Sequence, residues 1–467
     1  MKRLMLGLVL FSGFAFLALG CSNLKEGECK RDRHCDDKAT KLGELWVCYK
    51  EPPESEIGKC LLAKDARVAL AKYKKKKDGK CDDGDGDGVG VGDACEGPVD
   101  CNDKDKDVKP GGTEVCDTKD NDCDQVINEG LKSCVGTVLG GKRDPICHFM
   151  ITMTSGVAVA PNGDVWVSDQ HQIYRIDAKG IPTRFAGSNK PGHENKKGKF
   201  ARFDEPVGLA VGPDGSVYVA ECKNNCVRKL ATDGQVSTYA GLCSNEADNA
   251  GLDKLGNWNE ARFWCPIDLT FDADGSLLVV DRFNAKIKRI TKARKVELVA
   301  GVGGKDTDEG VVFGSANGPA LKAEFDQPVS IAKTADGAFV IADMKNNCIR
   351  LLKGGKVSTL AGQCAKVDVE KENFADGKAA KAKFKMPNGV AVAPDGTIYV
   401  ADTGNHCIRK IGGGKVTTAA GRCLQQGYFD GPVKDALFNQ PLAIDVAKDG
   451  SLWIIDHGNY RVRHLIP

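Results

Sequence analysis

The chain has 467 residues, a formal net charge of +2 at pH 7 and 41% hydrophobic residues. This length suits either a large all-β domain or more than one domain, with a sizeable core. The near-neutral charge gives no reason to expect a nucleic-acid partner. The one basic run, KYKKKK at 72–77, is too short to change this and is more simply a solvated linker.

Residues 1–20 have the pattern of a secretory signal peptide: two basic residues, an apolar run and then small residues. The segment leads into LALGC, which resembles a bacterial lipobox with Ala18 and Leu19 in the less common order. The resemblance implies that Cys21 is lipidated and becomes the mature N-terminus; without lipidation it would be an ordinary secreted cysteine. More than one acyl chain gives stable anchoring. We therefore expect a protein anchored by lipid in the bacterial cell envelope, at the outer membrane or cell surface.

Twenty cysteines in an exported chain predict disulfides. Besides Cys21, eleven lie between Cys29 and Cys147 and eight between Cys222 and Cys423. Within residues 21–80 we expect a small cysteine-stapled module followed by the basic linker, with four cysteines as its staples: Cys29, Cys35, Cys48 and Cys60. Because eleven is an odd number, one cysteine of the N-terminal set has no assignable partner, and the pairing of this set stays open.

Residues 81–134 form an acidic segment, in which sixteen carboxylates and four lysines lie between Asp82 and Glu129. Protein cations cannot neutralise this density locally, whereas Ca²⁺ takes six to eight oxygen ligands. The stretch DDGDGDGVGVGDAC at 82–95 is not an EF-hand, because Ala94 stands where the twelfth-position Glu is needed. It resembles instead the Asp-rich calcium repeats of thrombospondin-type proteins.

A second acidic pattern, DCNDKDKDVKPGGTEVCDTKDNDCD at 100–124, resembles a short metal-binding motif of bacterial surface proteins, such as those of myxobacteria. Asn102, Thr118 and Gln125 depart from that motif. The two resemblances imply a structural Ca²⁺ site or sites, held with disulfides in a fold that has almost no apolar core. The expected ligands are Asp83, Asp85, Asp87, Asp93, Asp100, Asp103, Asp105, Asp107, Glu114, Asp117, Asp120, Asp122 and Asp124.

Two other interpretations of this segment remain open. Its composition alone would also suit a disordered acidic spacer, although the regular cysteines argue against one. Zinc or copper held by thiolates is a third possibility, which oxidation of the cysteines would remove.

Residues 135–467 contain an internal repeat. EPVGLAVGPDGSVYVAECKNNCVRKL at 205–230 recurs as MPNGVAVAPDGTIYVADTGNHCIRKI at 386–411. Weaker copies begin at Cys265, Gln327 and Gln440, and another lies near Ser155. Each unit reads as short β-branched strands separated by Gly-containing turns. Four-stranded sheets packed radially against one another form a β-propeller.

The sequence of the repeating unit, including the connecting ARF, AEF, AKF and ALF stretches, resembles the NHL repeat. The last copy stops after its third strand. The stretch VGTVLGG at 135–141 matches the outer strand of the preceding copy, VTTAAGR at 416–422, and can supply the missing strand. We therefore expect an all-β chain with a six-bladed NHL-like propeller, closed by an N-terminal outer strand and preceded by the small disulfide-rich modules.

The register of the repeats predicts the cysteine pairs of the propeller. Three blades carry a cysteine in both of two equivalent positions and three carry neither, which is expected if the two pair within a blade. The remaining two cysteines fall on loops at one face of adjacent blades. The predicted pairs are Cys226–Cys243, Cys348–Cys364, Cys407–Cys423 and Cys222–Cys265.

An acid at the end of each second strand and a basic residue seven positions later recur in five blades, so we interpret them as ion pairs of the scaffold. His171, His406 and His457 break the repeat and follow that acid in consecutive blades 1, 5 and 6 of the closed ring. Related propellers include a peptide-amidating lyase with His-bound zinc, and metal-dependent lactonases and lyases. Three imidazoles and a water would suit Zn²⁺; histidines on surface loops are the simpler interpretation.

Two hypotheses for the function follow. In the first, the chain is a monomeric surface lipoprotein without enzymatic activity. Its propeller face binds a protein, peptide or glycan, and its acidic module is a stalk stiffened by Ca²⁺. In the second, the propeller is a metal-dependent lyase, lactonase or other hydrolase with its site at the channel mouth. Fold-level analogy favours the first, and analogy of that kind is weak support for a function.

Overall fold

The computed structural model describes residues 154–178, 180–243, 253–307, 310–364 and 374–467, together with Lys109 and four N-terminal strands. The chain divides into two compact units, residues 1–75 with 145–148, and residues 76–144 with 149–467. The described part of the first unit is a three-stranded antiparallel sheet in the order β1-β3-β2. Its strands are β1 (Glu28–Cys29), β2 (Trp46–Tyr49) and β3 (Gly58–Leu62).

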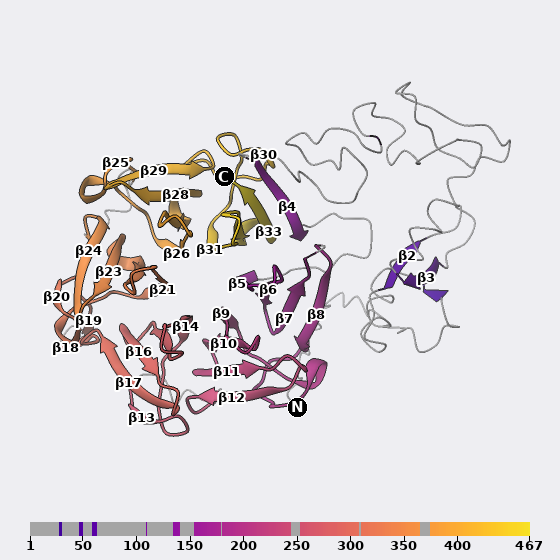
Figure 1. Ribbon diagram of the computed structural model, residues 1–467, viewed down its shortest axis with the longest axis horizontal. Helices are drawn as coiled ribbons and strands as arrows, with labels where there is room; N and C mark the ends of the chain where they lie inside the picture. Colours follow the sequence, from indigo (N-terminus) through magenta and orange to yellow (C-terminus); the bar gives the residue numbers. More distant parts are fainter. Residues whose placement is uncertain are drawn as a thin grey trace, which may run out of the picture. The chain divides into compact units, whose positions relative to one another are not determined.

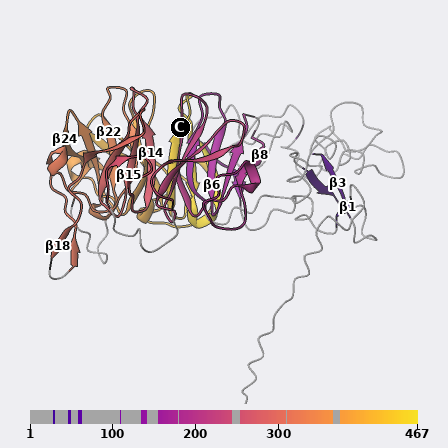
Figure 2. The same cartoon turned by 90° about the horizontal axis from the view of Figure 1, so that it is seen from below.

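The described part of the second unit is a ring of six antiparallel sheets arranged around a central axis (Figure 1). Figure 2 shows the same ring from its side, with the strands running between its two faces. Blades 1 and 2 contain β5 (Thr154–Val159), β6 (Val165–Asp169), β7 (Gln172–Ile176), β8 (Pro182–Gly187), β9 (Pro206–Val211), β10 (Val217–Glu221), β11 (Cys226–Leu230) and β12 (Val236–Ala240).

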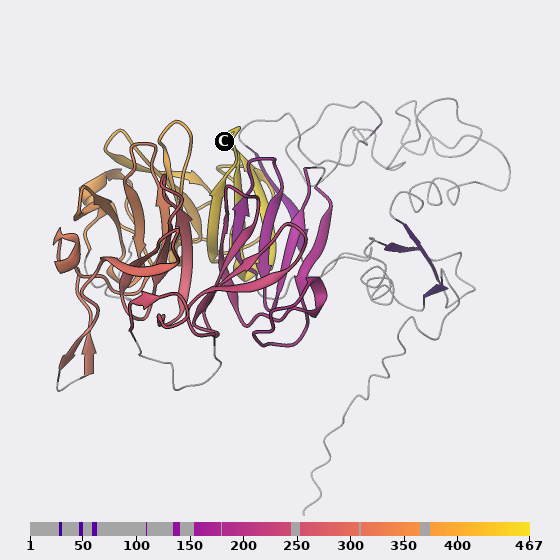
Figure 3. The same ribbon diagram turned by 60° about the horizontal axis from the view of Figure 1, so that its bottom comes forward.

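Blades 3 and 4 each add a two-residue strand outside the fourth strand. They contain β13 (Gly256–Asn257), β14 (Pro266–Phe271), β15 (Leu277–Asp281), β16 (Lys286–Ile290), β17 (Lys295–Ala300), β20 (Gly318–Pro319), β21 (Pro328–Lys333), β22 (Phe339–Asp343), β23 (Cys348–Lys353) and β24 (Lys356–Gly362). Between them, the hairpin of β18 (Lys305–Thr307) and β19 (Gly310–Val312) projects from the ring (Figure 3).

Blades 5 and 6 follow the same plan. They contain β25 (Gly377–Lys378), β26 (Pro387–Val392), β27 (Ile398–Asp402), β28 (Cys407–Gly412), β29 (Lys415–Ala420), β30 (Gly431–Pro432), β31 (Pro441–Val446), β32 (Leu452–Asp456) and β33 (Arg461–Ile466), with β4 (Cys134–Gly140). The helical elements of the described residues are single 3₁₀ turns, η2 (Gly198–Phe200), η4 (Ala320–Lys322), η5 (Met344–Asn346), η6 (Ala379–Lys381), η7 (Thr403–Asn405) and η8 (His457–Asn459). No helix in these ranges is long and apolar enough to cross a lipid bilayer.

The ring closes through β4, which is the outer strand of blade 6. It pairs antiparallel with β33, with Val135 opposite Leu465 and Gly140 opposite Arg461. Figure 1 shows the two strands side by side, although more than 300 residues separate them in the sequence. This confirms the predicted six-bladed propeller closed by an N-terminal outer strand. The reason is the unpaired edge of β33, which would otherwise expose a row of backbone donors and acceptors.

The core lies between blades rather than within one layer. The second strands are the most buried: every residue of β6, β10, β15, β22 and β27 is buried. This explains their nearly continuous apolar sequence, because both faces of each sheet are covered. One apolar cluster fills each of the six boundaries between neighbouring blades, including that between blades 6 and 1.

Candidate functional site

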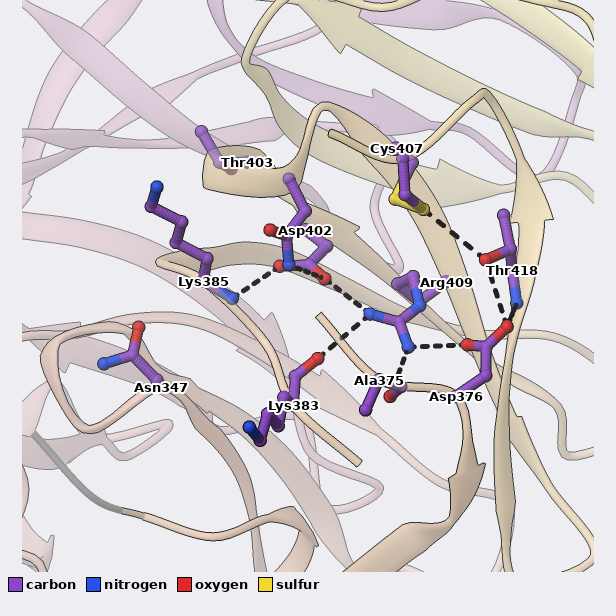
Figure 4. Close-up of polar contacts among 12 residues, drawn as sticks. Asn347, Ala375, Asp376, Lys383, Lys385, Asp402, Thr403, Cys407, Arg409 and Thr418 are labelled. Atoms are coloured by element: carbon purple, nitrogen blue, oxygen red, sulfur yellow. Dashed lines mark hydrogen bonds and ion pairs between the residues drawn. A yellow bond between two sulfur atoms is a disulfide. The ribbon is translucent and has the colours of Figure 1, made fainter. Parts of the chain in front are cut away.

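A buried ion pair lies at the centre of blade 5 (Figure 4). The fully buried Arg409 donates from Nη1 to Asp402 Oδ2 at 2.7 Å and to the Lys383 carbonyl at 3.1 Å. Its Nη2 donates to Asp376 Oδ1 at 2.6 Å and to the Ala375 carbonyl at 2.9 Å. A guanidinium group is suited to this role because its planar fork reaches several acceptors at once.

The same arrangement recurs in four other blades, at distances of 2.6–2.7 Å between the charged groups. Each cation also lies over the Phe of the A-x-F connection, as Arg409 lies 5.2 Å from the Phe384 ring centroid. In blade 1, Tyr174 occupies the position of the cation. The four further pairs are Glu221–Arg228, Asp281–Lys288, Asp343–Arg350 and Asp456–Arg463.

These pairs serve the scaffold, as the sequence predicts. Burial raises the pKa of Asp402 to about 6, while the charge of Arg409 opposes the shift. Asp402 Oδ1 accepts from the Lys385 backbone N–H at 2.8 Å, and Oδ2 accepts from Asn405 Nδ2 at 2.8 Å as well as from Arg409. Because Asp402 is also fully buried and its charge is already paired with Arg409, it is not available to a substrate.

Four disulfides cross-link the propeller in the pairs that the repeat register predicts. Cys226–Cys243, Cys348–Cys364 and Cys407–Cys423 each join the start of a third strand to the residues just after the fourth, with Cα–Cα distances of 4.9–5.1 Å. Cys222–Cys265 instead joins blade 2 to blade 3.

His406 is part of a link between blades 5 and 6. It ends the turn η7 in a left-handed conformation, with φ 58°, and its Nδ1 accepts a hydrogen bond from the Gln440 backbone N–H at 3.1 Å. An imidazole nitrogen that accepts must be unprotonated. Burial and the nearby charge of Lys385 lower the pKa of His406, in agreement with this neutral form.

Asparagines make the same contact in blades 2 and 4. Asn225 Oδ1 accepts from the Cys265 N–H at 2.8 Å, and Asn347 Oδ1 accepts from the Met386 N–H at 2.8 Å. His406 therefore replaces a structural asparagine.

The other two histidines lie at the corresponding turns of blades 1 and 6, and the three do not form a metal site. His171 Nδ1 lies 3.6 Å from Asp204 Oδ1, and His457 opens the turn η8. No group of three or more His, Cys, Asp or Glu side chains that could hold a metal ion exists among the described residues, which include all three histidines. The three-histidine zinc site is therefore not formed.

The inner strands β5, β9, β14, β21, β26 and β31 surround an axial cavity of about 570 Å³. Glycines bring these strands close together: a Cβ on Gly208 would lie 2.6 Å from the Asp268 Cα, and one on Gly389 would lie 2.9 Å from the Ile444 nitrogen. The volume falls within the range of small-molecule sites. None of the three histidines lines this cavity.

Among the described residues, five charged side chains line the cavity: Glu205, Asp268, Arg282, Lys333 and Asp445. Glu205 pairs with Lys223 at 2.5 Å, and Lys333 pairs with Asp272 at 3.1 Å. Asp268, Arg282 and Asp445 make no ion pair with any residue of the described ranges. Within the described ranges, the cavity therefore has one cation and two anions without an ion-pair partner.

The two aspartates hold the inner strands of neighbouring blades together. Asp268 Oδ2 accepts from the Ile331 N–H at 2.9 Å, and Asp445 Oδ2 accepts from the Val159 N–H at 2.7 Å. Burial raises the pKa of each to about 6. Their blades, 3 and 6, are opposite each other in a ring of six.

Sequence reasoning missed these three residues, although they too break the repeat. The register position of Asp268 holds Gly156, Gly208, Ser330, Gly389 or Ala443 in the other blades. The position of Asp445 holds Ala158, Ala210, Thr270, Ala332 or Ala391. Arg282 directly follows the second-strand acid, where the other blades have Gln170, Cys222, Met344, Thr403 or His457. Searching all residue types for such departures, and not only histidine, would have found them.

The expected sites of the N-terminal part lie outside the described residues. This applies to Cys21 and to every acidic ligand proposed between Asp83 and Asp124. Their assignments remain predictions from the sequence.

Comparison with known families gives a match in the repeat region and another in the acidic segment. Residues 194–412, from blade 2 to the third strand of blade 5, match the model of the teneurin NHL domain. Residues 100–129 match the family described as "Putative metal-binding motif". The resemblances noted from the repeat sequence and from the acidic pattern at 100–124 are thus confirmed.

Among curated relatives, teneurin-3 of Danio rerio is 30% identical over 220 residues, 44% of this chain and 8% of the relative. The chloroplastic protein SUPPRESSOR OF QUENCHING 1 of Arabidopsis thaliana is 25% identical over 297 residues, 60% of this chain and 27% of the relative. The matched stretch thus spans a small part of each relative.

Two solved structures from Bacteroides thetaiotaomicron share the fold. A structural genomics protein of unknown function has a TM-score of 0.51 at 20% identity, covering 71% of this chain and 75% of its own. An auxiliary nutrient binding protein has a TM-score of 0.50 at 16% identity, covering 72% and 76%. At these identities the likeness concerns the fold alone. The chain therefore carries a six-bladed β-propeller that matches the teneurin NHL domain over residues 194–412, and its residues 100–129 match the motif family named above.

Proposed function

We propose that the protein is a lipid-anchored protein of the bacterial cell envelope whose propeller is a binding scaffold, displayed on an acidic stalk that Ca²⁺ stabilises. The signal peptide and lipobox-like LALGC support the anchor, and the motif at 100–129 supports a metal in the stalk. The chain acts as a monomer at the outer membrane or cell surface.

The observation that carries the binding role is the axial cavity. The repeated acid–base pairs are buried and satisfied within their own blades, so they have no capacity left for a ligand. Asp268, Arg282 and Asp445 differ, because they line a cavity of about 570 Å³ and have no ion-pair partner in the described part of the chain. Uncompensated charge in a concave, partly apolar site favours ligand binding.

The alternative, a metal-dependent lyase or lactonase, has no specific observation in its favour. It requires His171, His406 and His457 to converge on one ion. Among the described residues no such group exists, and His406 Nδ1 is already occupied by the Gln440 N–H.

Binding is tested by thermal unfolding of the full chain against a panel of glycans, peptides and small metabolites. A ligand that binds only the folded state stabilises it by about 2.7 kcal/mol at 100 times its Kd, so a true ligand raises Tm by a few degrees. A flat response across the panel, with no effect on any component, argues against a binding scaffold.

The anchor is tested by changing Cys21→Ser and following the protein between membrane and soluble fractions. We expect loss of the acyl chains by mass spectrometry and release from the membrane. Ser22→Asp is a matched control, because family rules for bacterial lipoproteins predict retention at the inner membrane without loss of the lipid. Unchanged membrane association of the Cys21 variant would contradict the anchor.

The stalk is tested by elemental analysis of the purified full chain. Stoichiometric calcium that EGTA removes, with increased protease cleavage between residues 81 and 134, is expected. Stoichiometric copper or zinc in place of calcium would contradict the assignment of Ca²⁺ while leaving a metal-stabilised stalk.

A further inference from the structure

Arg282 stands at the cavity with most of its hydrogen-bonding capacity unused. Its Nη2 donates to Gln327 Oε1 of the next blade at 2.9 Å, and its guanidinium lies over the Phe283 ring at 4.9 Å. Its Nε is buried without a hydrogen-bond partner. A guanidinium has five N–H donors, so the contact with Gln327 fixes its position and leaves donors for an acceptor from outside the chain.

Other blades have a link at the same position as the Arg282–Gln327 contact, but those links are uncharged and do not explain why Arg282 carries a charge. The residue after the second-strand acid also links neighbouring blades in blade 2, through Cys222–Cys265, and in blade 5, where Thr403 Oγ1 donates to the Pro441 carbonyl at 2.5 Å. A disulfide and a hydroxyl provide this link without charge. An arginine without a carboxylate partner in the described ranges is a costly substitute for them.

The three unpaired charges lie at different depths along the axis. Arg282 follows Asp281, at the end of the second strand and therefore at the mouth. Asp268 pairs with Val280, one residue inside that end. Asp445 pairs with Trp453, three residues inside the equivalent end of blade 6. At about 3.3 Å per residue, Asp268 lies roughly 7 Å and Asp445 roughly 13 Å deeper than Arg282, so the midpoint between the two anions is roughly 10 Å from the cation at the mouth.

We propose that the axial cavity binds a short peptide with free ends, its carboxylate on the Arg282 guanidinium and its ammonium group between Asp268 and Asp445. A guanidinium binds a carboxylate through two parallel hydrogen bonds. An extended tripeptide separates its terminal charges by about 10 Å, whereas the two charges of a single amino acid are adjacent. The proposal rests on the binding role proposed above and gives that site a ligand class.

The test is equilibrium dialysis of the full chain with a mixed-sequence tripeptide pool, read out by mass spectrometry, with individual affinities then measured by calorimetry. Peptides with free ends are expected to be retained. Their C-terminal amides and their N-acetylated forms are each expected to bind at least tenfold more weakly, because each loses one charge partner.

Variants assign the two ends separately. In Arg282→Gln, binding of free peptides falls at least tenfold, and blocking the C-terminus then makes no further difference. In the double variant Asp268→Asn and Asp445→Asn, binding of free peptides also falls at least tenfold, and acetylating the N-terminus then weakens binding no further. Each asparagine oxygen can still accept the N–H group of the neighbouring blade, from Ile331 or Val159. The contact of the second carboxylate oxygen with the Leu269 or Val446 N–H is lost, so the Tm of the double variant is measured alongside its binding.

Two further variants distinguish loss of the site from loss of the fold. Arg422→Gln changes an exposed arginine that pairs with Asp435 at 2.8 Å, away from the cavity lining, and should bind normally. Arg282→Lys keeps the charge and should retain part of the affinity at an unchanged Tm. Failure of free-ended peptides to bind, or binding that the Arg282 and Asp variants do not alter, overturns the proposal. If another ligand in the Tm panel still binds, the scaffold role survives that result.

Discussion

Blades 5 and 3 each pair the buried carboxylate of the second strand with a cation, but the cation is an arginine in blade 5 and a lysine in blade 3. In blade 5, Arg409 joins two carboxylates and two backbone carbonyls. In blade 3, the ammonium group of Lys288 contacts Asp281 at 2.6 Å, Asp253 at 2.5 Å and the Arg262 carbonyl at 2.7 Å. Each cation thus has about as many acceptors as its geometry can serve.

The blades differ also in cross-links and at the axis. Blade 5 has the disulfide Cys407–Cys423 and, on its inner strand, Gly389. Blade 3 has no disulfide of its own among the described residues, and Asp268 stands at the register position of Gly389. Blades 5 and 3 thus share an acid, a cation and an apolar core, whereas they differ in the cross-link and in the axial residue.

The largest effect should follow from breaking the ion pair of blade 5. Arg409→Met leaves Asp402 buried without its cation, which costs about 3–5 kcal/mol. We expect the free energy of unfolding of the full chain, measured by urea titration, to fall by that amount. Arg422→Gln, at the surface, should change it by less than about 0.5 kcal/mol. A loss for Arg409→Met no larger than that of the control would show that the pair is not structural.

Removing the cross-link of blade 5 should have a somewhat smaller effect. The double change Cys407→Ser and Cys423→Ser opens a loop of about 16 residues, worth roughly 3 kcal/mol in the chain-entropy model. Hydrogen exchange should increase in β28 and β29 more than in β16 and β17 of blade 3. Equal increases in the two blades would contradict a local role for the disulfide.

Exchanging the two cations sharpens the comparison. Arg409→Lys loses the contacts that Nη2 makes with Asp376 and Ala375, at a cost of about 1–2 kcal/mol. Lys288→Arg should be tolerated less well than a surface change, because the site of blade 3 is fitted to three donors. Urea titrations of the two single variants and the double variant test this. If neither exchange changes the free energy of unfolding, the blades accept either cation.

The smallest effect concerns pH and Asp268. Its folded-state pKa of about 6 lies above the unfolded value of about 3.9, so the protonated form favours the fold. This contribution is fully present below about pH 4 and is lost as the pH rises through 6. Asp268→Asn should therefore be closest to the wild type at pH 4 and below, and its stability relative to the wild type should increase as the pH rises to 7.5.

The check is the difference between the two urea midpoints as a function of pH. Taking the difference cancels the groups that the variants share, such as Asp343 and His464, whose pKa values burial also shifts. A difference that does not vary between pH 4.5 and 7.5 contradicts the raised pKa.

The fold could be predicted because the same pattern of strands and turns recurs in each blade. The turn glycine Gly396, for example, has φ 85° and Gly215 has φ 75°, a conformation in which glycine is favoured, and each marks the same turn in its blade. The role of β4 could be predicted because the last copy ends one strand short. Repetition also exposed the ion pairs as scaffold.

The cavity residues could not be predicted in the same way. Whether Arg282 meets a carboxylate depends on the side chains of a neighbouring blade, and the sequence does not show that Gln327 lies beside it. The role of His406 could not be predicted either, for a related reason. His406 differs from Asn225 in chemistry, yet each offers one acceptor to the next blade, and a pattern of residue types does not reveal this equivalence.

The pairing of β4 with β33 also decides how the ring responds to tension. Cys134 lies opposite Ile466, so the two ends of the propeller leave it at the same end of one ladder. A force applied between them separates the pairs one after another, starting from Cys134, and does not slide all of them at once. Under mechanical load the molecule should open at this seam first, at a low force, while the five other blades stay intact.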